Sequence, residues 1–219
     1  METVAAVNEG YPKTAEALVV IAASAGGVEA TRTVLQGLPA NLPAAVVVVQ
    51  HRAAARPWYL DRVLQRYTGL PVRWVEEDMP LASGIVYLAP PDRHLRVTRD
   101  RLISPSDGRR IRFLLSSANP LFESAAEAYG ARAIGVVLTG GGTDATDGVQ
   151  AIASRGGIVI AQDENTSAHF SMPRSAIGTG AVNRVLPLEQ IAPTIVELLT
   201  RSPDTAVGPD GGVRVISDG

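Results

Sequence analysis

A hydroxyl, an imidazole and a carboxylate each stand shortly after an apolar run of this sequence. They belong to Ser24, His51 and Asp144. A serine nucleophile needs a base that takes its proton and an acid that holds the base in the right tautomer. In the chain order Ser–His–Asp, these three residues predict a nucleophilic hydrolytic site.

Each of these residues, taken alone, also has a structural interpretation. Ser24 or Asp144 would most often be a helix N-cap, and His51 a satisfied, partly buried imidazole. Asp147 suits the first turn of a helix because an acid there complements the helix dipole. The joint placement at three strand ends favours catalysis, on the condition that the three strands are neighbours in the sheet.

The composition argues against several other kinds of chemistry. The 219 residues contain no Cys and only three His, and Lys13 is the only Lys among 20 basic residues. A thiol nucleophile, a disulfide scaffold and Cys-ligated zinc are excluded, and Schiff-base chemistry is disfavoured. The three His show no metal-binding spacing, so we expect neither a metal nor another cofactor.

Charge and hydropathy bear on partners and location. A formal net charge of −2 argues against a general nucleic-acid binder. No run approaches the roughly 20 apolar residues that span a bilayer, and the N-terminus lacks the pattern of a secretion signal. We therefore expect a cytoplasmic protein that does not insert into membranes.

The glycine-rich turn after the first apolar run raises a nucleotide-binding alternative. Residues 22–27 (AASAGG) do not supply G-x-G-x-x-G, and the second run ends in Gln50-His51 instead of an acid. A G-x-x-x-x-G-K-[ST] phosphate loop is also absent from the sequence. Nicotinamide and nucleoside triphosphates are therefore disfavoured as ligands.

Apolar runs alternate with helical patterns along the chain, which predicts a doubly wound, mainly parallel α/β sheet with helices on both faces. The expected strands are 17–23, 44–50, 133–138 and 157–161, and the expected helices are 27–37, 57–67, 119–130, 145–155 and 188–200. We expect a catalytic domain at 17–201 between flexible tails at 1–16 and 202–219.

The middle of the chain, at about 71–112, breaks this alternation. Four short β-type runs lie there between turn residues, which predicts antiparallel hairpins added to the sheet. Seven Arg fall between Arg93 and Arg112. They form either a solvated hairpin surface or a docking face for an acidic partner.

Several sequence blocks resemble the catalytic domain of the chemotaxis protein-glutamate methylesterases, the CheB type. The similarity covers roughly residues 17–200, and its blocks lie at 19–30, 46–51, 84–95, 135–148 and 161–177. The resemblance implies that Ser24, His51 and Asp144 form the family's triad. It also implies a doubly wound fold with an antiparallel hairpin, matching the expectation from the alternating runs.

The resemblance implies hydrolysis of glutamyl methyl esters on the cytoplasmic helices of chemoreceptors, with release of methanol. Deamidation of selected receptor glutamines is a second implied activity. Met172 and Pro173 match a family block near the active-site edge, and His94 matches a position that we interpret as structural. The amides of two turns are candidates for an oxyanion hole: Ala25, Gly26, Gly27, Gly140, Gly141 and Gly142.

The sequence also departs from the family pattern. Family members usually carry an N-terminal receiver domain, whereas only about 16 residues precede the first strand here. This suggests a freestanding esterase regulated in another way, for example by a separate protein, or a shortened piece of a longer chain. Asn119 stands where the family usually has Asp. The alternative hypothesis is a weakly active or inactive receptor-docking module with the same fold.

Overall fold

The computed structural model describes residues 14–51, 59–106 and 116–200. The flexible tails expected at 1–16 and 202–219 lie almost wholly outside these ranges, as do three of the seven clustered Arg, at positions 109, 110 and 112. The expected limits of the catalytic domain, 17 and 201, stay a prediction.

A seven-stranded sheet forms the centre of the fold. Its strands are β1 (Leu18–Ala23), β2 (Ala45–Gln50), β3 (Val72–Trp74), β5 (Val86–Leu88), β8 (Ala133–Val137), β9 (Ile158–Gln162) and β10 (Arg184–Leu186). They lie in the order β10-β9-β8-β1-β2-β5-β3, and all the neighbouring strands run parallel. The predicted doubly wound α/β class is confirmed.

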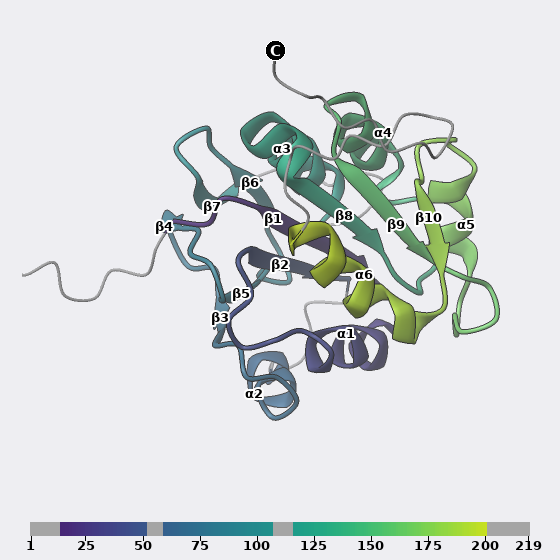
Figure 1. Cartoon of the computed structure of the whole chain (residues 1–219), viewed down its shortest axis with the longest axis horizontal. Helices are drawn as coiled ribbons and strands as arrows, with labels where there is room; N and C mark the ends of the chain where they lie inside the picture. The colour runs from purple at the N-terminus through teal and green to yellow at the C-terminus, as the bar shows by residue number, and fades with distance from the viewer. Residues whose placement is uncertain (1–13, 52–58, 107–115, 201–219) are drawn as a thin grey trace, which may run out of the picture.

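Helices cover both faces of this sheet. They are α1 (Gly27–Gln36), α2 (Leu60–Gln65), α3 (Asn119–Tyr129), α4 (Thr146–Ser154), α5 (Ser171–Ile177) and α6 (Leu188–Thr200). In Figure 1, α1 and α2 lie below the sheet and α3 and α4 lie above it. All five predicted helices are present within a few residues of their expected limits, and α5 was not predicted.

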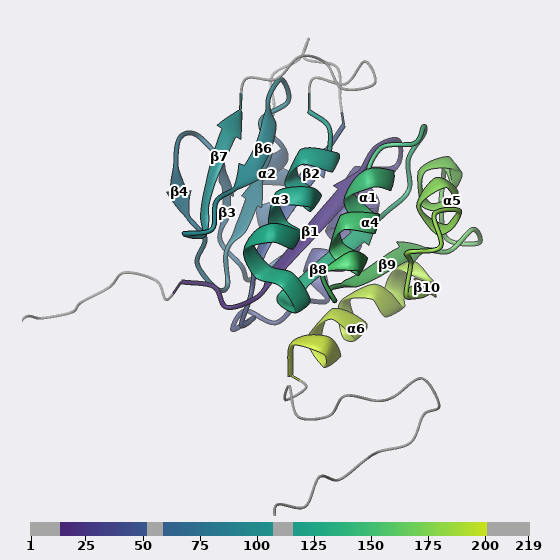
Figure 2. The ribbon, with the colours of Figure 1, turned by 90° about the horizontal axis from the view of Figure 1, so that it is seen from above.

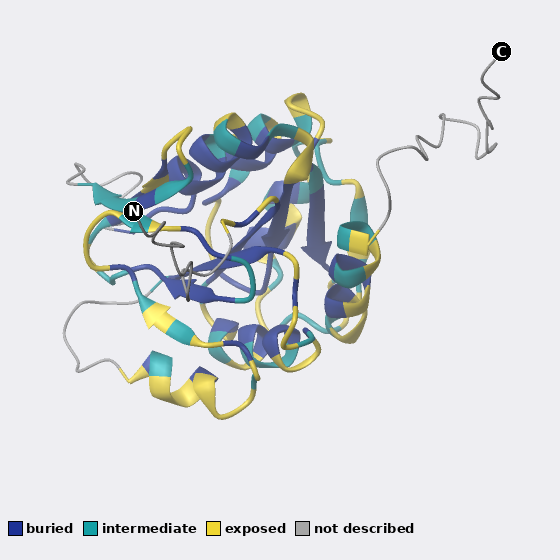
Figure 3. Ribbon diagram, turned by 60° about the vertical axis from the view of Figure 1, so that its left-hand side comes forward, coloured by how far each residue is buried: buried dark blue, intermediate teal, exposed yellow. Residues whose placement is uncertain are grey.

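The central strands are buried on both faces, which explains their unbroken apolar sequences. Every residue of β1 is buried, and its side chains alternate between two core clusters. Leu18, Val20 and Ala22 pack toward α3 and α4, whereas Val19 and Ile21 pack toward α1 and α6. Figure 3 shows the buried strands between helices whose outer faces are exposed.

A small antiparallel sheet flanks α3, as Figure 2 shows. It contains β4 (Met79–Pro80), β6 (His94–Val97) and β7 (Leu102–Ser106) in the order β4-β7-β6. The prediction of antiparallel hairpins is correct for β6 and β7 but wrong for the two runs that became β3 and β5. Those two strands pair in parallel within the main sheet, where β5 is fully buried between β2 and β3.

Candidate active site

Three neighbouring strands bring the predicted residues to one edge of the main sheet. Ser24 follows β1, His51 follows β2, and Asp144 stands in the turn after β8. Because β1 lies between β2 and β8, the condition set by the sequence is met. The amide of His51 donates to Ala23 O at 2.8 Å, and the amide of Ser24 donates to Thr139 O at 3.0 Å. These bonds tie the three strand ends together at the carboxyl edge, where parallel sheets place their sites.

His51 and Asp144 form a buried pair. The His51 Nε2 atom lies 2.8 Å from Asp144 Oδ2, and the side chains are only 6% and 2% exposed. The ring N–H does not point squarely at the oxygen, so the two atoms are in close contact with imperfect hydrogen-bond alignment. A carboxylate in this position can orient an imidazole and stabilise its protonated form.

Asp144 is held by a second set of donors. The Ser117 hydroxyl donates to Asp144 Oδ1 at 2.6 Å, and the Ala118 amide donates to Oδ2 at 2.6 Å. Burial raises the pKa of the Asp144 carboxyl, but His51, Ala118 and Ser117 together outweigh that effect and hold the pKa below its usual value. The carboxylate is therefore kept ionised inside the protein.

The structure replaces both N-cap interpretations. The N-cap position of α1 is Gly26, and that of α4 is Ala145; neither helix has a side-chain cap. The Asp144 carboxylate contacts His51, Ser117 and Ala118 instead. Asp147 does occupy the first turn of α4, as expected.

Ser24 lies on a tight turn between β1 and α1. Its carbonyl accepts a 2.7 Å hydrogen bond from Gln50 Nε2, which fixes the turn against the end of β2. Ser24 and His51 line the same open hollow, together with the N-terminal residues of α1. Among the described residues, no hydrogen bond joins the Ser24 hydroxyl to the imidazole of His51.

Two glycines make this arrangement possible. Gly26 adopts φ 76°, in the left-handed region that L side chains rarely enter. At Gly140, a Cβ would lie 2.7 Å from Ser24 Cβ and 2.9 Å from Met172 Cε. The turn after β8 can therefore approach the nucleophile turn only because residue 140 has no side chain.

The structure separates the candidate oxyanion donors into two groups. The amides of Gly27 and Gly140 already donate within the protein, to Ser24 O at 2.8 Å and His169 O at 2.8 Å. Within the described ranges, four other turn amides donate to no protein acceptor: those of Ala25, Gly26, Gly141 and Gly142.

Met172 and Pro173 are buried in the first turn of α5. The Met172 amide donates to Gly140 O at 2.9 Å, so α5 supports the turn after β8 from beside the site. The unpredicted helix α5 is thus the element that places these two residues.

Sequence reasoning missed the residues that support the site. Ser117 and Ala118 precede α3, and the only signal was a serine pair before the Asn-Pro start of that helix. Gln162 was also missed: its Oε1 atom accepts a 2.8 Å hydrogen bond from the amide of Thr139. A buried polar residue at the end of an apolar strand is a signal that could have indicated it.

The clustered Arg serve different purposes. Arg96 and Arg99 are exposed, whereas Arg101 donates to Ala15 O at 2.9 Å and lies 5.2 Å from the centre of the Tyr129 ring. Arg101 therefore joins the N-terminal segment to the core. Docking on the remaining surface stays a prediction.

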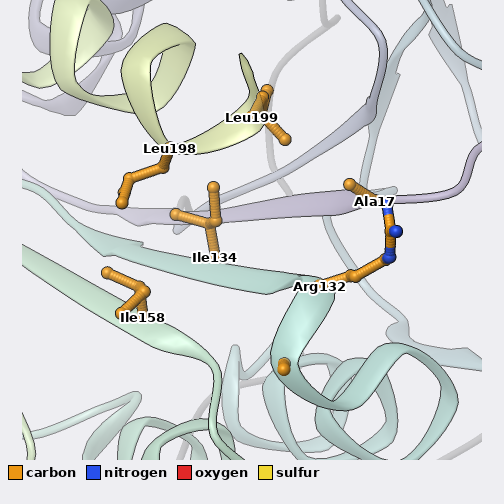
Figure 4. A pocket seen from close by; sticks show the side chains of 7 residues that line it. Ala17, Arg132, Ile134, Ile158, Leu198 and Leu199 are labelled. Atoms are coloured by element: carbon orange, nitrogen blue, oxygen red, sulfur yellow. The ribbon is translucent and has the colours of Figure 1, made fainter. Parts of the chain in front are cut away.

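An apolar pocket of about 320 Å³ lies at the opposite edge of the sheet (Figure 4). It is lined by Ala17, Ala131, Arg132, Ile134, Ile158, Leu198 and Leu199. The pocket holds no nucleophile and no acid–base pair, and it sits at the amino ends of β1, β8 and β9. The carboxyl edge therefore remains the candidate active site.

The described ranges contain no group of three or more His, Cys, Asp or Glu placed to hold a metal ion. In those same ranges, no helix has the length and apolar character needed to cross a membrane.

Comparison with known proteins identifies a family. The family model described as CheB methylesterase matches residues 19–195. The crystal structure of the Thermotoga maritima CheB methylesterase catalytic domain superposes with a TM-score of 0.80 at 34% identity, over 83% of this chain and 98% of that one.

Similar proteins differ in how much of their length this chain matches. A Leptospira interrogans relative is 39% identical over 82% of this chain and 93% of its own length. The protein-glutamate methylesterase/protein-glutamine glutaminase 2 of Anaeromyxobacter dehalogenans is 44% identical over 83% of this chain, but only 53% of that protein is covered. The protein-glutamate methylesterase FrzG of Myxococcus xanthus is 38% identical over 88% of this chain and 58% of its own length.

Proposed function

Because this chain belongs to the CheB methylesterase family, we propose that it is a protein-glutamate methylesterase with Ser24 as its nucleophile. The substrate is a methyl ester on a glutamate side chain of a chemoreceptor's cytoplasmic helices. The buried His51–Asp144 pair beside Ser24 is the observation that carries this proposal. The enzyme acts in the cytoplasm, in chemotaxis or a related signalling system, through a catalytic domain spanning 17–201.

In the acylation step, the Ser24 oxygen attacks the ester carbonyl while His51 takes the hydroxyl proton. With His51 Nε2 turned toward Asp144, the Nδ1 atom is the nitrogen available to the serine. Hydrogen bonds between a nucleophile and its base commonly shorten only when substrate binds. Asp144 stabilises the imidazolium that forms, because the carboxylate is ionised and 2.8 Å away.

The tetrahedral intermediate then loses methanol. His51 gives its proton to the departing methoxide oxygen, and the glutamyl group stays on Ser24 as an ester. Water attacks that ester with His51 again acting as base, which releases the glutamate carboxylate and restores the Ser24 hydroxyl. The same attack on a glutamine side chain releases ammonia, which is the proposed deamidase activity.

The oxyanion of the intermediate needs donors that are not already engaged. The unengaged amides of Ala25 and Gly26 directly follow the nucleophile, and those of Gly141 and Gly142 lie in the turn after β8. These four amides supply the donors. The amides of Gly27 and Gly140 are unsuited because each donates to a carbonyl of the protein itself. Met172 supports the Gly140 turn, and neither Met172 nor Pro173 has a chemical role in this scheme.

The test is release of methanol from a receptor that carries tritiated methyl esters. We expect the wild-type chain to release volatile label and the Ser24→Ala variant to release none above background. Equal release by both proteins, or none by either, would exclude the esterase. Receptor binding that survives in both proteins, without any methanol, would instead favour the docking module.

A further inference from the structure

A column of buried polar groups stands behind Asp144, and the reaction steps above do not use it. It consists of His94 on β6 and Ser117 before α3, which are 2% and 0% exposed. The Ser117 hydroxyl donates to Asp144 Oδ1 at 2.6 Å, and the Ser117 amide donates to His94 Nδ1 at 2.9 Å. The column therefore joins the small antiparallel sheet to the acid of the triad.

The direction of each hydrogen bond follows from the groups present. Asp144 is ionised and can only accept, so the Ser117 hydroxyl must donate to it. A backbone amide can only donate, so His94 Nδ1 must be an unprotonated acceptor. Ser117 is thus held through its backbone by His94 while it holds Asp144 through its side chain.

The two oxygens of Asp144 have separate partners. Oδ1 faces Ser117, while Oδ2 faces both the Ala118 amide and His51 Nε2. Rotation of the carboxylate would exchange these partners and move Oδ2 away from His51. The Ser117 hydroxyl opposes this rotation at Oδ1, where it is the donor found among the described residues, and the Ala118 amide opposes it at Oδ2.

We propose that Ser117 is a positioning residue that orients the Asp144 carboxylate toward His51, and that His94 fixes Ser117 for this purpose. This proposal rests on the proposed function, in which Asp144 supports the base. A merely structural Ser117 would satisfy a buried carboxylate and stabilise the start of α3. The two roles differ in what happens to the reactivity of Ser24 in protein that remains folded.

The experiment measures the rate at which a fluorophosphonate reagent labels Ser24, normalised to the amount of protein that can be labelled. It also measures kcat and KM for methanol release. Ser117→Ala is compared with Ser116→Ala, since Ser116 is a buried neighbour without a hydrogen bond to Asp144 in the described structure. A lost hydrogen bond to a charged group corresponds to about a 10- to 100-fold effect. We expect Ser117→Ala to lose that factor in both labelling rate and kcat, with KM unchanged and complete final labelling.

Four further variants keep the test decisive. Ser117→Cys fills the same space with a weaker donor and carries the test if the alanine variant does not fold. His94→Asn keeps a hydrogen-bond acceptor near the Nδ1 position, whereas His94→Leu has a side chain of similar size without an acceptor. We therefore expect Ser24 to be labelled faster in His94→Asn than in His94→Leu. Ser124→Ala, which removes a buried hydroxyl bonded to the Val97 amide, controls for loss of stability alone.

The outcomes separate this proposal from the proposed function. If Ser117→Ala labels within about twofold of Ser116→Ala, well inside the effect of one lost hydrogen bond, Ser117 does not position the acid. Equal labelling by His94→Asn and His94→Leu would remove His94 from the proposal. A wild-type protein whose Ser24 labels rapidly but which releases no methanol would contradict the proposed substrate and leave the positioning result intact.

Discussion

Replacement of Asp144 by Asn separates the charge of this residue from its shape. The Ser117 hydroxyl can turn to accept from the new amide nitrogen, while the amide oxygen keeps the Ala118 and His51 contacts of Oδ2. The Ala118 amide therefore keeps its acceptor, whereas the Ser117 hydroxyl hydrogen loses the carboxylate to which it donates in the wild type. We expect Asp144→Asn to fold normally and to lose activity because the imidazolium loses its counter-charge.

The size of this loss follows from the geometry. Charge on the carboxylate and the imidazolium is delocalised, so the 2.8 Å contact places the charge centres about 4 Å apart. At an effective dielectric constant of about 20, their attraction is about 4 kcal/mol. The amide retains a neutral hydrogen bond worth about 1 kcal/mol, which leaves a loss of about 3 kcal/mol, or about 100-fold in kcat.

The assay is methanol release at saturating receptor, with thermal unfolding as the check on folding. Asp147→Asn is the matched control, because it makes the same chemical change at an exposed position in the first turn of α4. A folded Asp144→Asn enzyme with more than about a third of the wild-type kcat would refute the assigned role of the buried carboxylate.

Three further predictions concern the surroundings of the site and the core. Gly140→Ala places a Cβ 2.7 Å from Ser24 Cβ, so we expect at least about a tenfold fall in rate. At Gly178, an added Cβ would lie 3.4 Å from its nearest heavy atom, so the rate of Gly178→Ala should match that of the wild type. Tyr129→Phe should raise stability by about 1 kcal/mol in denaturant unfolding, because the buried hydroxyl has no partner among the described residues and burial raises its pKa to about 12. The pKa of Asp144 is lower in the folded protein than in the unfolded chain. The ionised carboxylate therefore stabilises the fold above about pH 4, and this stabilisation is lost as pH falls through the pKa of Asp144 in the folded protein. The difference in melting temperature between wild type and Asp144→Asn should therefore shrink below about pH 4, and a constant difference down to acid unfolding would contradict this.

The sequence was most informative where one physical rule dominates. Strands buried on both faces must be apolar throughout, so β1, β2, β8 and β9 were recognisable from composition alone. The same rule located the strand ends and with them Ser24, His51 and Asp144. The position of each residue after its strand was enough to group the three residues, because the carboxyl ends of parallel strands meet at one edge of the sheet.

Long-range pairing was less accessible. The strands β3 and β5 are only three residues long, and nothing in such short runs distinguishes parallel pairing from a hairpin. The supporting roles of Ser117 and His94 could not be predicted for a related reason, since they depend on contacts across 23 and 27 positions of the chain. Helix α5 was missed because its seven residues begin with Ser-Met-Pro, a sequence also typical of turns.

In the proposed mechanism, Ser24, His51 and Asp144 act as one catalytic unit on a glutamyl methyl ester. Methanol release from Ser24→Ala, His51→Ala and the corresponding double variant tests this directly. Residues that act as a unit are strongly non-additive, so each single change should reduce kcat by at least about 10⁴-fold and the double variant should be no slower than the single ones. Single variants near wild-type activity, or losses that multiply in the double variant, would show that these residues do not act as one catalytic unit.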